Sequence, residues 1–159
     1  MNPSARPTTV DRLIIHQFDP AHPSPGGIDT CLRGLATYAP DDLVLAFVGV
    51  DAGADRSRRL GRWEQHRVGD RTVWFMPVVR LDPANQARTV PHSLRLMAGV
   101  LRFRGRLPRA RAVQAHRADT AWATRWLVRA PLAYFIHTQE HGLTGATSDS
   151  FWRVAGRIH

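Results

Sequence analysis

The chain has 159 residues, 43% of them hydrophobic, and a formal net charge of +9. This length and apolar content suit one compact domain with a full core. Its apolar runs are short and interrupted by arginine, which excludes a membrane-spanning helix, and its polar N-terminus lacks the apolar core of a signal peptide. A single cysteine, Cys31, excludes an internal disulfide and a cysteine-cluster metal site. We therefore expect a cytoplasmic protein.

Arginine supplies the whole of the positive side-chain charge, because all 22 basic residues are arginine. A charge of this size should attract the protein to anions. Nucleic acids, phosphorylated small molecules and anionic lipid surfaces all have the required charge, and composition does not choose among them.

Apolar runs typical of buried strands alternate along the chain with segments of helical spacing, after a flexible lead expected at residues 1–10. The expected elements are, in chain order, a strand at 12–18, a helix at 28–39, strands at 42–50 and 72–79, a helix at 92–107, a strand at 111–116, a helix at 118–130, a strand at 131–137 and a helix from 148. This order predicts an α/β fold, with a Rossmann-like parallel sheet and helices on both faces. We expect one domain over 11–159 that belongs to a longer protein, because the last helical pattern stops without a cap or glycine.

The helix expected at 92–107 has two distinct faces. Each face gathers residues of one kind: Leu94, Met97 and Leu101 on the first, and Arg95, Arg102 and Arg106 on the second. We interpret the arginine face as solvated, with side-chain stems that cover apolar surface. The alternative is contact with an anionic membrane surface.

Two tryptophans, Trp122 and Trp126, lie four residues apart in the helix expected at 118–130, as do Arg125 and Arg129. We interpret the tryptophans as core residues and the arginines as the solvent edge of the same helix.

Ligands of open parallel sheets bind beyond the carboxyl ends of the strands, and the loop with Gly26 and Gly27 lies at such a position. Unbonded amides at the start of the following helix favour a phosphate, and glycine permits close approach of the ligand to the backbone. The alternative is a plain strand-to-helix turn, since the spacing G-x-G-x-x-G and the P-loop lysine are both absent.

Two successive predicted strands end in histidine, at His116 and His137. Rings at equivalent strand ends would lie along one sheet edge, where they can donate hydrogen bonds to phosphate or sugar oxygens. The alternative is that each ring bonds a nearby backbone carbonyl. A metal site built from His137 and His141 is disfavoured, because partner ligands are missing.

Taken in order, three stretches resemble the N-terminal domain of the family 4 glycosyltransferases, which have the GT-B fold. The first is "FDPAHPSPGGI" with the helical "LRGLA" after it, the second is "AVQAHRADTAWAT", and the third is "PLAYFIHTQEHG". Each motif is loose, and their order and spacing along nearly the whole chain carry the resemblance.

The resemblance implies a retaining, metal-independent, hexosyltransferase-like enzyme that transfers a sugar from a nucleotide-diphosphate donor and needs no further cofactor. It implies that Gly26 and Gly27 approach the donor diphosphate and that His137 is the catalytic residue beside the transferred sugar. His116 and Glu140 would line the acceptor side, and the acceptor would be a sugar or a lipid-linked compound.

Two features depart from the family pattern. His16 stands where the family has an apolar or small residue, and the chain ends before the Glu-x7-Glu motif of the donor domain. We therefore expect this chain alone to be inactive. The alternative function is a stand-alone basic α/β module that binds nucleic acid or an anionic membrane, although no nucleic-acid-binding motif is visible.

Overall fold

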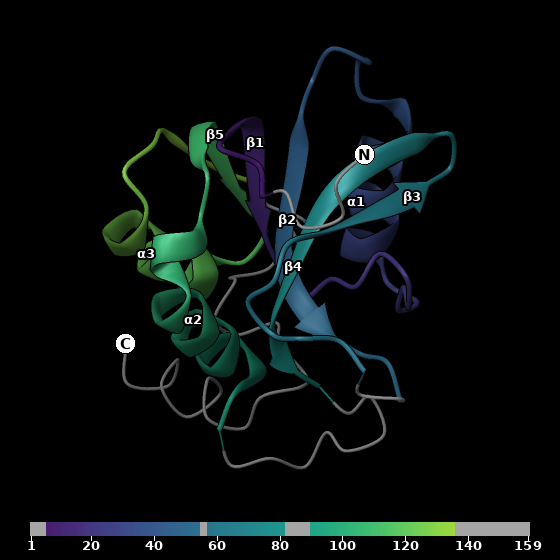
Figure 1. Ribbon diagram of the computed structural model, residues 1–159. Helices are drawn as coiled ribbons and strands as arrows, with labels where there is room; N and C mark the ends of the chain where they lie inside the picture. The colour runs from purple at the N-terminus through teal and green to yellow at the C-terminus, as the bar shows by residue number, and fades with distance from the viewer. Residues whose placement is uncertain (1–5, 55–56, 82–89, 136–159) are drawn as a thin grey trace.

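Six strands form one sheet at the centre of the computed structural model, which describes residues 6–54, 57–81 and 90–135 (Figure 1). The strands are β1 (Thr9–Ile15), β2 (Leu45–Asp51), β3 (Glu64–Val68), β4 (Arg71–Arg80), β5 (Arg109–Ala115) and β6 (Leu132–Tyr134). Their order across the sheet is β3-β4-β2-β1-β5-β6. All neighbouring strands are parallel except β3 and β4, which are antiparallel.

Helices cover both faces of the sheet. The helix α1 (Gly27–Tyr38) lies on one face, and α2 (His92–Arg102) and α3 (Ala118–Leu127) lie on the other (Figure 1). A short 3₁₀ turn, η1 (Arg104–Arg106), follows α2. The predicted α/β class, with a mostly parallel sheet between helices, is confirmed.

Two apolar clusters attach the helices to the sheet. Ile14 packs with Leu32 of α1, whereas its neighbour Leu13 belongs to the cluster that contains Leu96 of α2. Adjacent residues of a strand point to opposite faces, so β1 needs apolar side chains at consecutive positions. Full burial of each such side chain contributes about 1.5–3 kcal/mol to stability. The continuous apolar run of β2, in which every residue is buried, has the same cause.

The three apolar residues assigned to one helix face, Leu94, Met97 and Leu101, do not all lie on the buried face of α2. Leu96, Met97 and Val100 face the core, whereas Leu94 and Leu101 are 44% and 47% exposed. The spacing of the buried residues matches one stripe of a helix, and the predicted stripe lies to one side of it. The helix also ends at Arg102, earlier than expected.

The placement of the two tryptophans was predicted wrongly. Trp122 and Trp126 are 71% and 74% exposed, and the buried face of α3 consists of Thr120, Ala121 and Thr124. Small side chains let the α3 backbone approach the sheet, and they leave no room under the helix for an indole ring.

The strand β3 was not among the predicted elements; it pairs with β4 across the turn at Gly69 and Asp70. Its side chains are mostly polar and alternate between half-buried and exposed, so it has no apolar run. The signal was the Gly-Asp pair, where Gly69 has a φ of 60°. At the N-terminus, Thr9 and Val10 belong to β1 and not to the expected lead.

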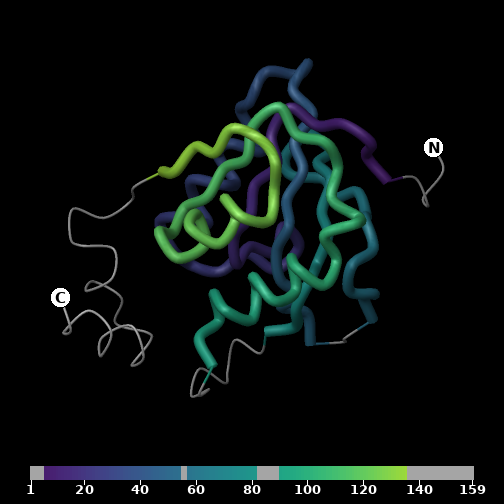
Figure 2. The backbone as a smooth tube through the Cα atoms, turned by 90° about the vertical axis from the view of Figure 1, so that its left-hand side faces the viewer, coloured from purple at the N-terminus to yellow at the C-terminus, as the bar shows by residue number. Residues whose placement is uncertain are grey.

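The last described residue is Phe135, directly after β6, which lies beside β5 at one edge of the sheet (Figure 2). The helix expected from residue 148 lies outside the described residues. Among those residues, no helix has the length and apolar character that a membrane span requires.

Candidate functional site

The strand order reverses beside β1, because the chain passes from β1 to β2 on one side and later returns to β5 on the other. Open α/β sheets bind ligands beyond the carboxyl ends of the strands at such a reversal. The residues that directly follow β1 and β5 are His16 and His116. The candidate site is therefore centred on these two histidines.

The two rings are neighbours because β1 and β5 pair in parallel with Ile15 opposite Ala115. The ring centroids of His16 and His116 are 5.8 Å apart, with an interplanar angle of 59°. The residues are 7% and 3% exposed, so both imidazoles are buried at the carboxyl ends of their strands. The predicted partner of His116 was His137, and His16 was expected only to depart from the family pattern.

Hydrogen bonds orient the ring of His116. Arg12 Nη1 donates to Oε1 of Gln114 at 3.2 Å, which turns the amide nitrogen of Gln114 toward His116. The distance from Gln114 Nε2 to Nε2 of His116 is 2.7 Å. Because the amide nitrogen is the donor, Nε2 of the imidazole accepts, and the neutral ring carries its proton on Nδ1. The ring of Phe135 stacks on the ring of His116, with 5.4 Å between centroids.

A buried ion pair fixes the loop that follows β1. Arg58 Nη1 lies 2.8 Å from both carboxylate oxygens of Asp19, whose side chain is fully buried. Asp19 also accepts from the amides of Ala21 and Ala52, each at 3.0 Å. It therefore joins the start of the Gly-Gly loop to the chain just after β2.

Electrostatics keep this pair ionised. Burial alone would raise the pKa of Asp19, but the hydrogen bonds from Arg58, Ala52 and Ala21 outweigh burial, so the net pKa is lowered. For Arg58, burial acts to lower the pKa, and the bond to Asp19 with the charges of Glu64 and Asp51 raises it overall. The pair is thus a structural element of the site and not a proton donor near neutral pH.

The loop's two glycines, Gly26 and Gly27, stand at the start of α1. Among the described residues, a Cβ added at either position meets no atom within 4 Å, and no side chain caps the helix. Gly26 has extended backbone angles that any residue adopts. Packing within the described part of the chain therefore does not require glycine here, which leaves space above the helix amides for a ligand.

Asp29 in the first turn of α1 accepts from the amide of Ser24 at 3.0 Å, which bends the loop back over the helix start. Burial raises the pKa of Asp29, and the Ser24 amide and the charge of Arg33 offset only part of this effect. Asp29 therefore loses its negative charge at a higher pH than an exposed aspartate does.

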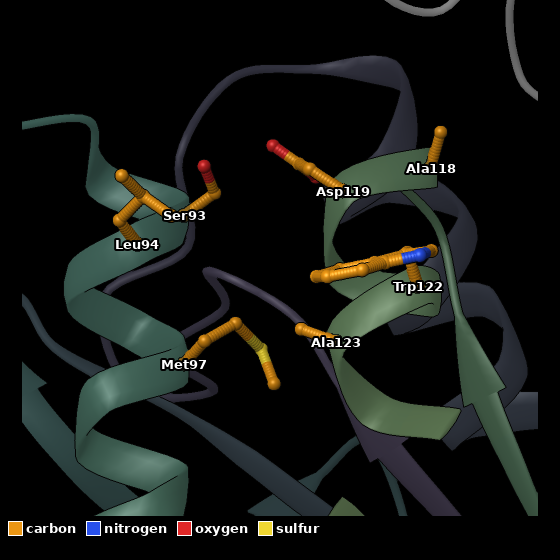
Figure 3. Close-up of a pocket in the computed structure, with 7 residues that line it drawn as sticks. All are labelled: Ser93, Leu94, Met97, Ala118, Asp119, Trp122 and Ala123. Carbon is orange, nitrogen blue, oxygen red and sulfur yellow. The ribbon is translucent and has the colours of Figure 1, made fainter. Parts of the chain in front are cut away.

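A mostly apolar pocket of about 470 Å³ lies between α2 and α3 (Figure 3). The residues that line it are Ser93, Leu94, Met97, Ala118, Asp119, Trp122 and Ala123. The side chains of Ser93 and Asp119 point toward each other across its opening (Figure 3). Burial would raise the pKa of Asp119, but its pair with Arg117, 3.0 Å away, lowers the pKa overall.

The three arginines assigned to one face of the helix expected at 92–107 do not share one helical face. Arg95 and Arg102 belong to α2, and Arg106 lies beyond it in η1. Arg95 donates to the carbonyl of Arg80, and Arg106 donates to that of Gly61, each at 2.9 Å. Part of their hydrogen-bonding capacity is thus used within the chain.

Two further predicted site residues, His137 and Glu140, lie outside the described residues, as does His141. Within the described ranges, no three histidine, cysteine or carboxylate side chains gather as a metal site would require. Comparison of the chain with protein-family models, with curated proteins and with solved structures finds no match.

Proposed function

We propose that the chain is the N-terminal, acceptor-side domain of a retaining glycosyltransferase that uses a nucleotide-diphosphate sugar. One observation carries the proposal: His16 and His116 lie side by side at the carboxyl ends of the two strands that flank the reversal of the sheet. This is the position where open α/β sheets bind their ligands. The order of the three sequence motifs supplies the reaction class.

The proposed roles follow from the chemistry of each group. The amides at Gly26 and Gly27 would bind the donor diphosphate, on which negative charge increases as its bond to the sugar breaks. His137 would contact the transferred sugar, and His116 and Glu140 would contact the acceptor. His16, beside His116, is an additional candidate for the acceptor side.

In the proposed enzyme, a second, donor-binding domain would supply most of the nucleotide contacts, and residues 1–159 alone would be inactive. The reaction would need no metal or further cofactor. The protein would act in the cytoplasm, with its arginines at an anionic membrane when the acceptor is lipid-linked.

The test uses the full-length protein that the gene encodes. Transfer from uridine-, guanosine- and adenosine-diphosphate sugars is measured by release of the nucleoside diphosphate. His137→Ala should lower turnover by about tenfold or more, as expected for loss of a hydrogen-bonding or acid–base group. His66→Ala, on β3, is the matched control and should retain turnover. Unchanged turnover in His137→Ala removes that residue from the site, and failure to bind any nucleotide-sugar refutes the family proposal.

A second candidate is a basic module that binds nucleic acid or an anionic membrane without catalysis, favoured by the exposed Arg102 at the end of α2 and Arg104 in η1. Such binding should weaken steeply with salt, because neutralised phosphates release counterions. A salt titration with duplex, single strand and anionic vesicles measures it. Tight, salt-dependent binding without nucleotide-sugar binding would support this candidate over the transferase.

A further inference from the structure

A second pocket, of about 380 Å³, opens where the chain connects β2 to β3. We call it the arginine pocket, and the residues that line it are Ser57, Arg58, Arg59, Arg62, Trp63 and Glu64. It is separate from the apolar pocket between α2 and α3, because the two share no lining residue.

The turn that carries the arginine pocket is held in place on several sides. Arg62 donates its amide to the carbonyl of Arg59 at 3.2 Å, and Gly61 donates its amide to Pro77 of β4 at 2.7 Å. Gly61 has a φ of 75°, and a Cβ there would lie 2.3 Å from the ring of Phe103. The turn therefore has one arrangement, which only glycine permits at this position.

Hydrogen bonds that involve Trp63 and Arg106 also stabilise this turn. Its Nε1 donates to the carbonyl of Arg106 at 2.8 Å, and Arg106 Nη1 donates to the carbonyl of Gly61 at 2.9 Å. Trp63 is 4% exposed, so this contact is buried. The backbone that presents Arg59 and Arg62 is thus preorganised, and a ligand would not need to order it.

Carboxylates neutralise one arginine of the pocket but not the other two. Arg58 pairs with Asp19, and its Nε lies 3.3 Å from Oε1 of Glu64. Within the described residues, Arg59 and Arg62 are exposed and take part in no ion pair or side-chain hydrogen bond. Two positive charges at the ends of one fixed turn therefore face solvent, and no described carboxylate pairs with them, since the Glu64 carboxylate of the same pocket pairs with Arg58.

From this geometry we propose that the arginine pocket binds a phosphoryl group through Arg59 and Arg62. Two guanidinium groups match the charge of a phosphate dianion, and each can form paired hydrogen bonds to its oxygens. The phosphoryl group belongs either to a soluble phosphorylated compound or to a lipid headgroup. The proposal does not rest on the transferase assignment, since it uses none of the histidines or glycines of that site.

The test titrates the full chain with inorganic phosphate and pyrophosphate at constant ionic strength. The readout is the indole N–H resonance of Trp63, assigned with Trp63→Phe, and it should shift and saturate. The double variant Arg59→Gln, Arg62→Gln should weaken binding by about tenfold or more, since charge-assisted bonds are lost. The matched double variant Arg125→Gln, Arg129→Gln, which removes the same charge from exposed positions near α3, should not.

Vesicles separate the two sources of the phosphoryl group. Phosphatidylcholine vesicles with and without phosphatidic acid are sedimented with each double variant. If only the Arg59 and Arg62 glutamine variant fails to sediment with vesicles that contain phosphatidic acid, the site is assigned to a lipid headgroup. A specific loss of phosphate binding alone assigns it to a soluble compound.

The proposal is overturned if phosphate gives no saturable shift in the unsubstituted chain, or if both double variants weaken every probe equally. Arg59→Lys with Arg62→Lys keeps the charge but removes the planar fork, and it should give an intermediate loss. This pair decides the question if the glutamine variant does not fold.

Discussion

His16 and His116 place their ring centroids 5.8 Å apart at the reversal of the sheet, although a hundred residues separate them in the sequence. Their proximity follows from the parallel register of β1 and β5, not from a local motif. Because Gln114 donates to Nε2 of His116, that ring presents Nδ1–H as its donor. The site therefore combines one imidazole whose tautomer follows from the Gln114 bond with the neighbouring imidazole of His16.

Loss of the Gln114 amide should release this tautomer. In Gln114→Leu, Nε2 of His116 loses its donor, so the neutral ring should become a mixture of both tautomers. Long-range proton–nitrogen spectra of ¹⁵N-histidine distinguish the two ring nitrogens and measure the ratio. Thr72→Leu, an exposed substitution on β4, is the control and should leave the His116 signals in place. An unchanged single tautomer in Gln114→Leu would show that another group orients the ring.

The pair of Asp19 and Arg58 should contribute much of the order of the Gly-Gly loop. Asp19→Asn is expected to lower the free energy of unfolding by about 3 kcal/mol, because it breaks a buried ion pair and leaves the arginine incompletely bonded. Urea unfolding measures the change. Asp70→Asn, at a fully exposed carboxylate, should leave the midpoint unchanged. If Asp19→Asn unfolds at the same urea midpoint as the unsubstituted chain, the ion pair makes no net contribution to the free energy of unfolding.

The same pair should make stability depend on pH in the acid range. The folded-state pKa of Asp19 lies below its ordinary value of 3.8, because the bonds from Arg58 and two amides outweigh burial. Its stabilisation is thus complete above the unfolded-state pKa and is lost as the pH falls through the folded-state pKa. The gap in unfolding free energy between the unsubstituted chain and Asp19→Asn should therefore shrink as the pH falls below 3.8. A gap that widens toward acid pH would contradict this sign.

The elements that sequence analysis predicted well are those with continuous apolar runs, such as β2 and β4, because a strand buried on both faces needs such a run. The polar strand β3 gave no such signal. The exposed indoles of α3 were misread because a four-residue spacing reports a shared face and not which face is buried. The pairing of His16 with His116 depends on strand register between distant segments, which no local pattern contains.

Two glycines offer a direct test of whether the Gly-Gly loop is open for a ligand. Gly99 of α2 approaches β4 so closely that a Cβ would lie 2.6 Å from the carbonyl oxygen of Val78, whereas a Cβ at Gly26 meets no described atom within 4 Å. Gly99→Ala should therefore lower the free energy of unfolding by about 1–2 kcal/mol, since overpacking outweighs the higher helix propensity of alanine. Gly26→Ala should leave it unchanged.

Binding should respond to the same two variants in the opposite way. If the amides at Gly26 contact a donor diphosphate, a methyl group there should weaken binding of nucleotide-sugar to the full-length protein by about tenfold, because the phosphate can no longer approach the helix start. Gly99 lies in α2, on the other face of the sheet. The variant Gly99→Ala should therefore bind the donor normally under conditions in which it is folded. Calorimetric titration of both variants measures this contrast. Normal donor binding by Gly26→Ala would mean that the loop is a plain turn, and a large loss of stability in that variant would mean that the fold itself requires the glycine.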